Sequence, residues 1–368
     1  MPCIFPVYSR RARGSPPRHT SHACKKNPAD PRADFLTSPY LHVIINLSEY
    51  VRRTIMRYDP SIYPKCTVPA AEVNRVKGLG FLRDKTTPDC FNARVITRNG
   101  KITADEMYAI ADAARRFGTG EVAFTTRQTA EVQGISFENI QPFCHFLSMH
   151  GLMVGGTGPR VRPVVSCKGT TCVFGLIDTF SLSRKIHELY YVGYHAVKLP
   201  HKFKIAVGGC PNNCVKPDLN DVGVIGAWKP VLVPDACKGC GACVKACPIG
   251  VATLQEGKFA NTKDCNKCGR CVRACHVGGL DYIPGYRLTV GGRWGKQVAR
   301  GQALSHLFTS EEEVLAAVEK AILLFRDKGV AGERFADTVA RIGLEEAERL
   351  ILSDELLQRK DEILEKAL

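Results

Sequence analysis

Twelve of the 17 cysteines fall into four tight clusters, and two of these clusters share the spacing C-x2-C-x2-C-x3-C. The two runs are "CKGCGACVKACP", with Cys237, Cys240, Cys243 and Cys247, and "CNKCGRCVRACH", with Cys265, Cys268, Cys271 and Cys275. Three thiolates at this spacing can occupy three corners of an iron–sulfur cube. A zinc site normally closes a tetrahedron with isolated C-x2-C pairs, which fits these runs poorly. The spacing therefore predicts two [4Fe–4S] clusters that transfer electrons.

The two runs form an internal repeat with a period of about 28 residues. The repeat resembles a bacterial two-[4Fe–4S] ferredoxin, in which the fourth cysteine of each run crosses to the other cluster. The resemblance implies one cluster on Cys237, Cys240, Cys243 and Cys275, and another on Cys265, Cys268, Cys271 and Cys247.

Four further cysteines lie upstream, Cys167 and Cys172 in "SCKGTTCVFG" and Cys210 and Cys214 in "IAVGGCPNNC". Each of them alone could be an inert buried thiol. In the second stretch "KIAV" predicts a strand, the two glycines a tight turn, and Pro211 the first position of a helix. Cys210 and Cys214 would then share a face at the helix N-terminus, where free N–H groups favour an anionic, thiolate-ligated cluster.

Basic residues precede this turn in an alternating pattern, "HKFKIAV". On a strand, Lys202 and Lys204 point to one face while Phe203 and Ile205 point into the core. A lysine whose pKa is lowered toward neutrality can give up a proton, so the pair suits a site that binds and protonates an anion. A solvated surface charge is the alternative for any single lysine or arginine.

The elements that must position these groups follow an α/β pattern. Residues 93–98 and 121–135 predict strands, and Ala104–Phe117 and Ile140–His150 predict helices. This order favours an α+β, ferredoxin-like half-domain. The strand "YRLTVGG" follows the cysteine runs, and the first C-terminal helix opens with a capping box at Thr309–Glu312. The C-terminal helices are predicted at 310–328, 334–342 and 344–366.

Charge and composition limit the partners. The formal net charge is +15, but residues 1–55 carry nine Arg or Lys against three acidic residues, and no basic stripe interleaved with aromatics follows. An anionic substrate and an anionic cofactor account for this balance, and nucleic-acid binding is not expected. No apolar window is long enough for a membrane span. Clustered free thiols predict a reducing, anaerobic cytoplasm.

The upstream cysteine motif resembles the siroheme/[4Fe–4S] domain of the nitrite and sulfite reductase family. The segments "ARVITRNGKIT", "TTRQ", "GPRVRPVVSC", "LPHKFKIAVGGCPNNC" and "GERF" match family segments in the same order, and the resemblance extends from about Asp59 to the C-terminus. The two cysteine runs make the chain most similar to single-half members of the anaerobic and dissimilatory type. The chain departs from many members in the four residues, one fewer than usual, between Cys167 and Cys172.

Composition and resemblance together divide the chain. Residues 1–55, rich in Arg and Pro, are expected to be a disordered or artefactual extension before a natural start at Met56. The expected fold class is α+β, a ferredoxin-like half-domain plus a siroheme/[4Fe–4S] α/β domain with an inserted two-[4Fe–4S] ferredoxin domain. These three are expected at residues 56–150, at 151–232 with 283–368, and at 233–282.

The resemblance also implies roles for single residues. The four upstream cysteines would hold a [4Fe–4S] cube, and Cys214 would bridge it to the siroheme iron, whose opposite face stays open to substrate. The family's sulfite-binding cations correspond to Arg94, Arg162, Lys202 and Lys204. Its residues near the siroheme carboxylates correspond to Arg127, Arg160 and Arg334.

These assignments predict an enzyme that reduces sulfite to sulfide, with siroheme and three [4Fe–4S] clusters in all. A nitrite reductase of the same family and a non-catalytic multi-cluster electron-transfer subunit stay open as alternatives. The cations beside the turn disfavour the second alternative, because a pure relay needs no anion site. No flavin or nicotinamide motif is present, so another subunit or a soluble carrier is expected to supply electrons, and a homo- or hetero-oligomer is expected.

Overall fold

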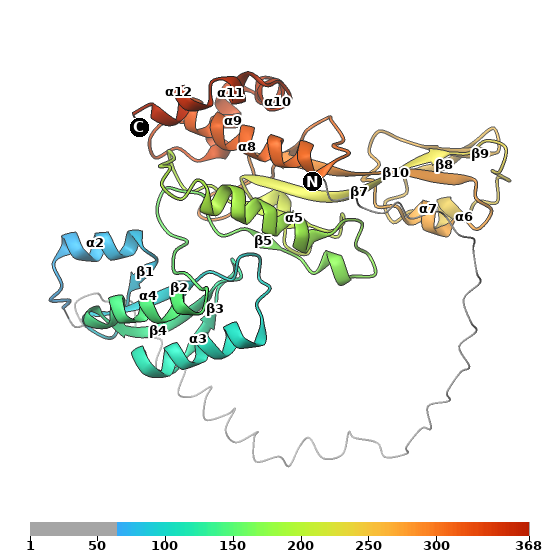
Figure 1. The fold of residues 1–368 in the computed structure, drawn as a ribbon. Helices are drawn as coiled ribbons and strands as arrows, with labels where there is room; N and C mark the ends of the chain where they lie inside the picture. The colour runs from blue at the N-terminus through green and yellow to red at the C-terminus, as the bar shows by residue number, and fades with distance from the viewer. Residues whose placement is uncertain (1–64, 368) are drawn as a thin grey trace, which may run out of the picture. The chain divides into compact units, whose positions relative to one another are not determined.

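The computed structural model describes residues 65–367, and its elements are labelled as in Figure 1. The expectations for residues 1–55 and for a start at Met56 lie outside the described residues. The helices are α2 (Ala70–Gly78), α3 (Ala104–Phe117), α4 (Ile140–Met149), α5 (Thr179–Ile186), α6 (Ala242–Lys245), α7 (Arg270–Ala274), α8 (Glu311–Lys328), α9 (Phe335–Ile342), α10 (Leu344–Leu352), α11 (Glu355–Gln358) and α12 (Lys360–Glu365). The strands are β1 (Phe81–Arg83), β2 (Cys90–Val95), β3 (Val122–Phe124), β4 (Ala130–Ser136), β5 (Val165–Ser166), β6 (Ile205–Gly208), β7 (Val222–Leu232), β8 (Ala252–Gln255), β9 (Lys258–Asn261), β10 (Leu280–Val290) and β11 (Gln302–Ala303). None of the helices in this part of the chain combines the length and apolarity needed to cross a membrane.

The first sheet has the order β1-β2-β4-β3, and each neighbouring pair is antiparallel. Burial alternates along β2, whose inward side chains pack with the buried faces of α3 and α4. Helix α3 spans its predicted range, Ala104–Phe117, and begins with a capping box between Thr103 and Glu106. The strand predicted at 93–98 is observed three residues earlier, because the chain turns at Arg98 with a positive φ of 63°.

The second sheet has the order β11-β10-β7-β6-β5. Strands β5, β6 and β7 are parallel, whereas β7, β10 and β11 are antiparallel. Strands β7 and β10 pair along their whole length, from Val222 opposite Val290 to Leu232 opposite Leu280. Residues 233–279 therefore leave and re-enter the sheet at one end of this two-stranded ribbon.

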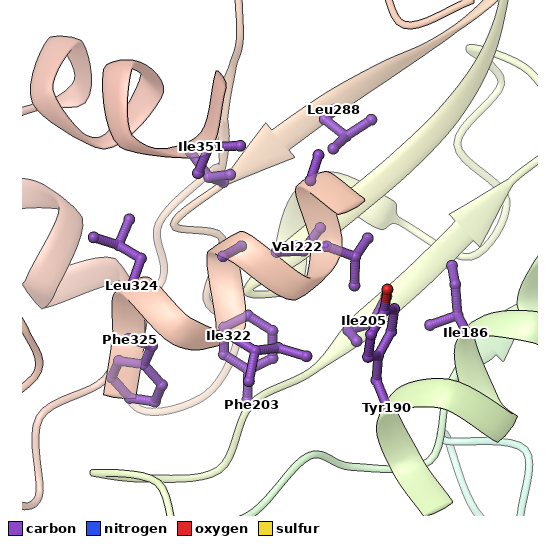
Figure 2. Close-up of a cluster of buried hydrophobic side chains, with 14 of the residues drawn as sticks. Ile186, Tyr190, Phe203, Ile205, Val222, Leu288, Ile322, Leu324, Phe325 and Ile351 are labelled. Atoms are coloured by element: carbon purple, nitrogen blue, oxygen red, sulfur yellow. The ribbon is translucent and has the colours of Figure 1, made fainter. Parts of the chain in front are cut away.

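The core of the second sheet fixes the direction of the segment that bears Lys202 and Lys204. Strand β6 begins at Ile205, so the two lysines precede the strand and do not lie on it as predicted. Figure 2 shows Phe203, Ile205 and Val222 grouped with Ile322 and Phe325 of α8. The ring centroids of Phe203 and Phe325 are 5.8 Å apart. Phe203 and Ile205 are both fully buried, which confirms the alternation predicted for this stretch. Lys202 and Lys204, which alternate with these two residues, therefore point away from this core.

Two predictions for the C-terminal helices are wrong in detail. The cap of α8 is Ser310, whose hydroxyl accepts from the Glu313 N–H at 3.1 Å, and Glu313 in turn accepts from the Thr309 N–H at 2.9 Å. The box therefore begins one residue after the predicted position. The single helix predicted at 344–366 is divided into α10, α11 and α12. The first break is at Ser353, which is extended, and serine readily leaves the helical conformation because its side chain competes for backbone hydrogen bonds.

Residues 233–279 form a small unit with a core of its own. The unit contains the hairpin β8–β9 and the two short helices α6 and α7. Each short helix begins at a glycine in the left-handed conformation, Gly241 with φ 71° and Gly269 with φ 70°. The two cysteine runs therefore repeat in local structure as they do in sequence.

Candidate active site

The turn that follows β6 differs from the prediction. Beyond β6 the chain runs through successive turns, so the helix predicted to begin at Pro211 is wrong. Asn213 has a positive φ of 54°, which a continuous α-helix does not contain. Asparagine tolerates this conformation because its short side chain can bond to nearby backbone. Cys210 and Cys214 are therefore positioned by turns and not by a helix N-terminus.

The loop with the other two upstream cysteines lies against this turn. The Gly209 N–H donates to Sγ of Cys167 at 3.1 Å. A Cβ at Gly209 would lie 2.7 Å from Cα of Gly169, so only glycine allows the two segments to approach this closely. The four residues between Cys167 and Cys172 include the 3₁₀ turn Gly169–Thr171. The Cys172 N–H donates to the Gly169 carbonyl at 3.2 Å.

All four upstream cysteines lie near one another. Burial, and to a smaller extent the neighbouring thiols of Cys167, Cys214 and Cys172, raise the pKa of the Cys210 thiol. Cys214 is exposed, whereas the other three are partly buried. Such a set can hold a cluster in a partly desolvated site and present one thiolate outward.

A cavity of about 380 Å³ joins the predicted cations. It is lined by residues of the half-domain, of the loop before β5 and of the segment that leads into β6. The lining residues are Lys77, Leu82, Arg94, Thr125, Thr126, Arg127, Thr129, Gly156, Thr157, Gly158, Arg162, Pro163, Lys202 and Lys204. All four predicted sulfite-binding cations are therefore brought together, with Arg127, while Arg160 and Arg334 do not line this cavity.

Arg94 and Arg162, two of the three arginines that line the cavity, differ in how many of their N–H donors have partners. The Nε of Arg94 donates to Glu131 at 3.0 Å. Arg162 donates from Nη1 to the Gly156 carbonyl, and its buried Nε has no hydrogen-bond partner among residues 65–367. Burial, followed by the nearby charge of Arg94, lowers the pKa of Arg162 to about 10. A buried guanidinium with an unused donor is suited to an anionic group in the cavity.

Lys202 and Lys204 contribute ammonium groups that no protein group neutralises. Neither Nζ has a hydrogen-bond or ion-pair partner in the part of the chain that the structure describes. Burial, followed by the charges of Arg127 and Arg334, lowers the pKa of Lys204 to about 8. Burial is also the main reason that the pKa of Lys202 is lowered. The cavity therefore holds a cationic group that can exchange a proton near neutral pH.

Asp221 binds the segment that leads into β6, and it was not among the predicted residues. Its fully buried carboxylate accepts from Nη2 of Arg334 at 3.0 and 3.1 Å and from the Lys204 backbone N–H at 2.8 Å. The only sequence signal was an acidic residue directly before the apolar run of β7. Because Arg334 is directed at Asp221, its role near the siroheme carboxylates stays a prediction.

Arg127 and Gln128 connect the half-domain to the second sheet. Arg127 donates from Nε to the Pro163 carbonyl at 3.0 Å, from Nη1 to Asn220 Oδ1 at 2.9 Å, and from Nη2 to a carbonyl of β6 at 3.1 Å. Gln128 exchanges two hydrogen bonds, 2.8 and 2.9 Å, with the backbone of Ser166, the residue before the first upstream cysteine. Gln128 was not predicted as a site residue, although it belongs to the "TTRQ" segment.

The cysteines of the two runs line two separate small cavities. Cys237, Cys240, Cys243 and Cys275 line one, and Cys247, Cys265, Cys268 and Cys271 line the other. The fourth cysteine of each run thus lies with the first three of the other run, which is the grouping that the ferredoxin resemblance implies. Phe259 lines both cavities. Among residues 65–367, no three His, Cys, Asp or Glu side chains are arranged to bind a single metal ion.

Two family models match the chain. The model described as "Nitrite and sulphite reductase 4Fe-4S domain" matches residues 157–360, and the model described as "Nitrite/Sulfite reductase ferredoxin-like half domain" matches residues 83–145. The first match contains the upstream cysteines, the cysteine runs, Lys202 and Lys204. The second contains strands β2, β3 and β4 of the half-domain sheet, and Arg94.

Curated relatives agree with these matches. An uncharacterized protein of Methanocaldococcus jannaschii is 35% identical over 70% of this chain and 89% of its own length. The coenzyme F420-dependent sulfite reductase of the same organism is 32% identical, over 75% of this chain and 43% of its own length. A subunit of the anaerobic sulfite reductase of Salmonella typhimurium is 32% identical, over 43% of this chain and 51% of its own length. The chain therefore spans about half of each named reductase, or less.

A solved structure shares the fold. The crystal structure of dissimilatory sulfite reductase I superposes with a TM-score of 0.58 at 22% identity, over 71% of this chain and 69% of that chain. From the two family models, the first of which matches more than half of the chain, this chain belongs to the nitrite and sulfite reductase family.

Proposed function

We propose that this chain catalyses the siroheme-dependent reduction of sulfite to sulfide. One observation carries the proposal: the unpaired ammonium groups of Lys202 and Lys204 share a cavity with Arg162. Both lysines lie in the segment just before β6, the strand that leads into the cysteine turn. The relatives whose names state sulfite reduction support sulfite as the substrate.

The residues present fit a siroheme coupled to a [4Fe–4S] cluster. Cys167, Cys172, Cys210 and Cys214 would hold the cluster, and Cys214, the exposed member, would be shared with the siroheme iron. Siroheme carries carboxylates on its rim, and the unused Nε of Arg162 and the cationic lining suit such groups. When bound, the coupled cofactors would supply electrons one at a time to the anion. Arg127, Arg160 and Arg334 stay the proposed neighbours of the carboxylates.

The side chains of the chain itself bind the anion and move protons. Arg94 and Arg162 remain protonated at neutral pH and can donate hydrogen bonds to sulfite oxygens. A six-electron reduction removes each oxygen as water, so the site must deliver protons repeatedly. Lys204 can release a proton from Nζ to a departing oxygen and regain one from solvent, because its pKa is about 8.

The affinity for sulfite is expected to fall as the pH rises through about 8. Below this pH Lys204 is charged and attracts the anion, and above it the neutral amine loses that attraction. KM for sulfite should therefore rise across the range from about pH 7 to 9. The control is the dependence of KM on pH for Lys204→Arg, whose side chain stays charged over this range. Sulfite ionises in the same way in both experiments, so a difference between the two profiles reports on Lys204. Identical profiles for the two proteins would contradict the role of Lys204.

We further propose that residues 233–282 are a two-[4Fe–4S] ferredoxin domain that feeds electrons to the site. The support is the pair of four-cysteine cavities and the repeated glycine-to-helix geometry around them. The proposed total is three [4Fe–4S] clusters. The electrons would come from a partner subunit or a soluble carrier, in an assembly of like or unlike subunits.

Anaerobic purification of the full chain tests the proposed function. The expected protein shows siroheme absorption, contains about 13 iron atoms per chain, and has a higher kcat/KM with sulfite than with nitrite. About eight iron atoms per chain without siroheme absorption would instead indicate a non-catalytic electron-transfer subunit. A higher kcat/KM with nitrite would assign the chain to the nitrite reductases of the family.

A further inference from the structure

The two copies of the cysteine repeat contact the rest of the chain differently. Lys245 in "CVKAC" and Arg273 in "CVRAC" occupy the same position of the two copies. Arg273 donates from Nη1 to the Val173 carbonyl at 2.6 Å and from Nη2 to the Gly175 carbonyl at 3.2 Å. Lys245 makes no side-chain hydrogen bond or ion pair within residues 65–367. At this shared charged position, therefore, only the side chain of the second copy, Arg273, forms hydrogen bonds with the rest of the described chain.

The second copy also packs on Trp228 of β7, and the first copy does not. The Arg273 guanidinium lies 4.9 Å from the centre of the Trp228 ring. The Trp228 backbone N–H donates to the Lys267 carbonyl at 2.8 Å. A Cβ at Gly269 would come within 2.8 Å of the Trp228 ring, whereas the equivalent Gly241 has open space. Gly241 and Gly269 have nearly the same φ, so the backbone of the two copies is alike at this point. The copies differ in the contact of Gly269 with Trp228.

The carbonyls that Arg273 binds belong to the loop that carries Cys172. The Cys172 carbonyl accepts from the Gly175 N–H at 2.8 Å, and the next N–H, of Leu176, donates to the Gly209 carbonyl at 2.9 Å. Gly209 in turn adjoins Cys210. The loop is thus held between the cysteine turn on one side and α7 on the other.

We propose that Arg273 is a positioning residue that docks the second cysteine copy against the Cys172 loop. The cavity lined by Cys247, Cys265, Cys268 and Cys271 then becomes the immediate neighbour of the upstream cysteines. Arginine suits this position because its planar fork reaches two carbonyls at once, which a lysine ammonium on a flexible stem does poorly. The inference rests on the proposed function only in taking these cysteines as cluster ligands.

The electron balance of this arrangement is simple. One electron leaves the group held by the second cavity, which is oxidised, and reduces the group held by the upstream cysteines. The electron is replaced from an external low-potential one-electron donor, a reduced flavin or ferredoxin carrier. No proton or bond is exchanged at Arg273, whose part is to fix the distance between the two groups.

Hydrogen exchange of the anaerobically purified full chain tests the docking. Arg273→Ala is expected to raise the exchange rates of the Gly175 and Leu176 amides about tenfold, because two charge-assisted hydrogen bonds are lost. Lys245→Ala is the matched control and should leave these amides unchanged. Arg273→Lys is expected to give an intermediate rate, since one hydrogen bond can form. Unchanged exchange in Arg273→Ala would overturn the proposal.

Electron paramagnetic resonance of the reduced chain distinguishes positioning from general stability. Magnetic coupling between reduced clusters falls with their distance, so Arg273→Ala should narrow the coupled signal while Lys245→Ala preserves it. A lower unfolding temperature with an unchanged coupled signal would overturn the positioning role. Missing siroheme absorption in the unmodified chain would refute the proposed function. The hydrogen-exchange comparison would still test the docking by Arg273, because it does not require siroheme.

Discussion

Lys204→Met is expected to lower kcat for sulfite reduction by roughly 10²–10⁴-fold, the usual contribution of a positioned proton donor. The Lys204 side chain lines the cavity that also contains Arg94 and Arg162. Burial, followed by the charges of Arg127 and Arg334, lowers the pKa of Lys204 to about 8. The neutral thioether of methionine can neither attract the anion nor supply a proton. Steady-state rates at saturating sulfite, normalised to siroheme absorption, measure the effect.

Two further variants separate the charge of Lys204 from its proton. Lys204→Arg keeps a positive charge that stays protonated, so KM should remain near the wild-type value while kcat falls as in the methionine variant. Lys198→Met removes a lysine from the same segment that does not line the cavity, and it is expected to retain the wild-type rate. Wild-type turnover in Lys204→Arg would show that the protons come from another group.

Asp221→Ala is expected to destabilise the protein by about 3–5 kcal/mol. The substitution leaves Arg334, whose side chain is 7% exposed, as an unpaired buried charge, and it removes the acceptor of the Lys204 backbone N–H. At the start of β7, among the described residues, the segment that presents Lys202 and Lys204 then keeps only the hydrogen bond from the Val222 N–H to the Lys204 carbonyl, 3.0 Å. The shift of the urea unfolding midpoint, at equal cofactor content, measures the destabilisation.

Asp112→Ala is the surface control for this prediction. Asp112 pairs with Arg116 one helical turn away, and the two side chains are 41% and 58% exposed, so its loss should cost less than about 1 kcal/mol. The double variant Asp221→Ala with Arg334→Met removes both buried charges and is expected to recover part of the lost stability. A double variant as unstable as the single one would mean that packing, not the unpaired charge, determines the cost.

Short-range patterns predicted the parts of this fold that local chemistry controls. The period-two alternation of "HKFKIAV" gave the correct buried residues, Phe203 and Ile205, because one face of the strand packs on α8. Helix α3 begins and ends where its apolar period predicts. The resemblance of the cysteine runs to a two-[4Fe–4S] ferredoxin implied which sulfurs line each small cavity.

Contacts between distant segments were beyond such patterns. Proline at the first position favours a helix, but Asn213 enters the left-handed region, and close packing of Gly209 against Gly169 selects turns. The partners of Arg334 and Arg127 lie more than 30 residues away in sequence, so motif matching located these arginines without revealing their bonds. Asp221 was missed for the same reason.

The ribbon of β7 and β10 has a consequence for how such a chain can change through evolution. Leu232 pairs with Leu280, and the Val233 N–H donates to the Gly279 carbonyl at 3.0 Å, so the insert enters and leaves at a single step of the ladder. A segment with adjoining ends can be gained, lost or exchanged as a cassette without shifting the register of the strands that bear it. The segment that we propose to supply electrons can therefore diversify among descendants while the cavity lined by Lys202 and Lys204 keeps its geometry.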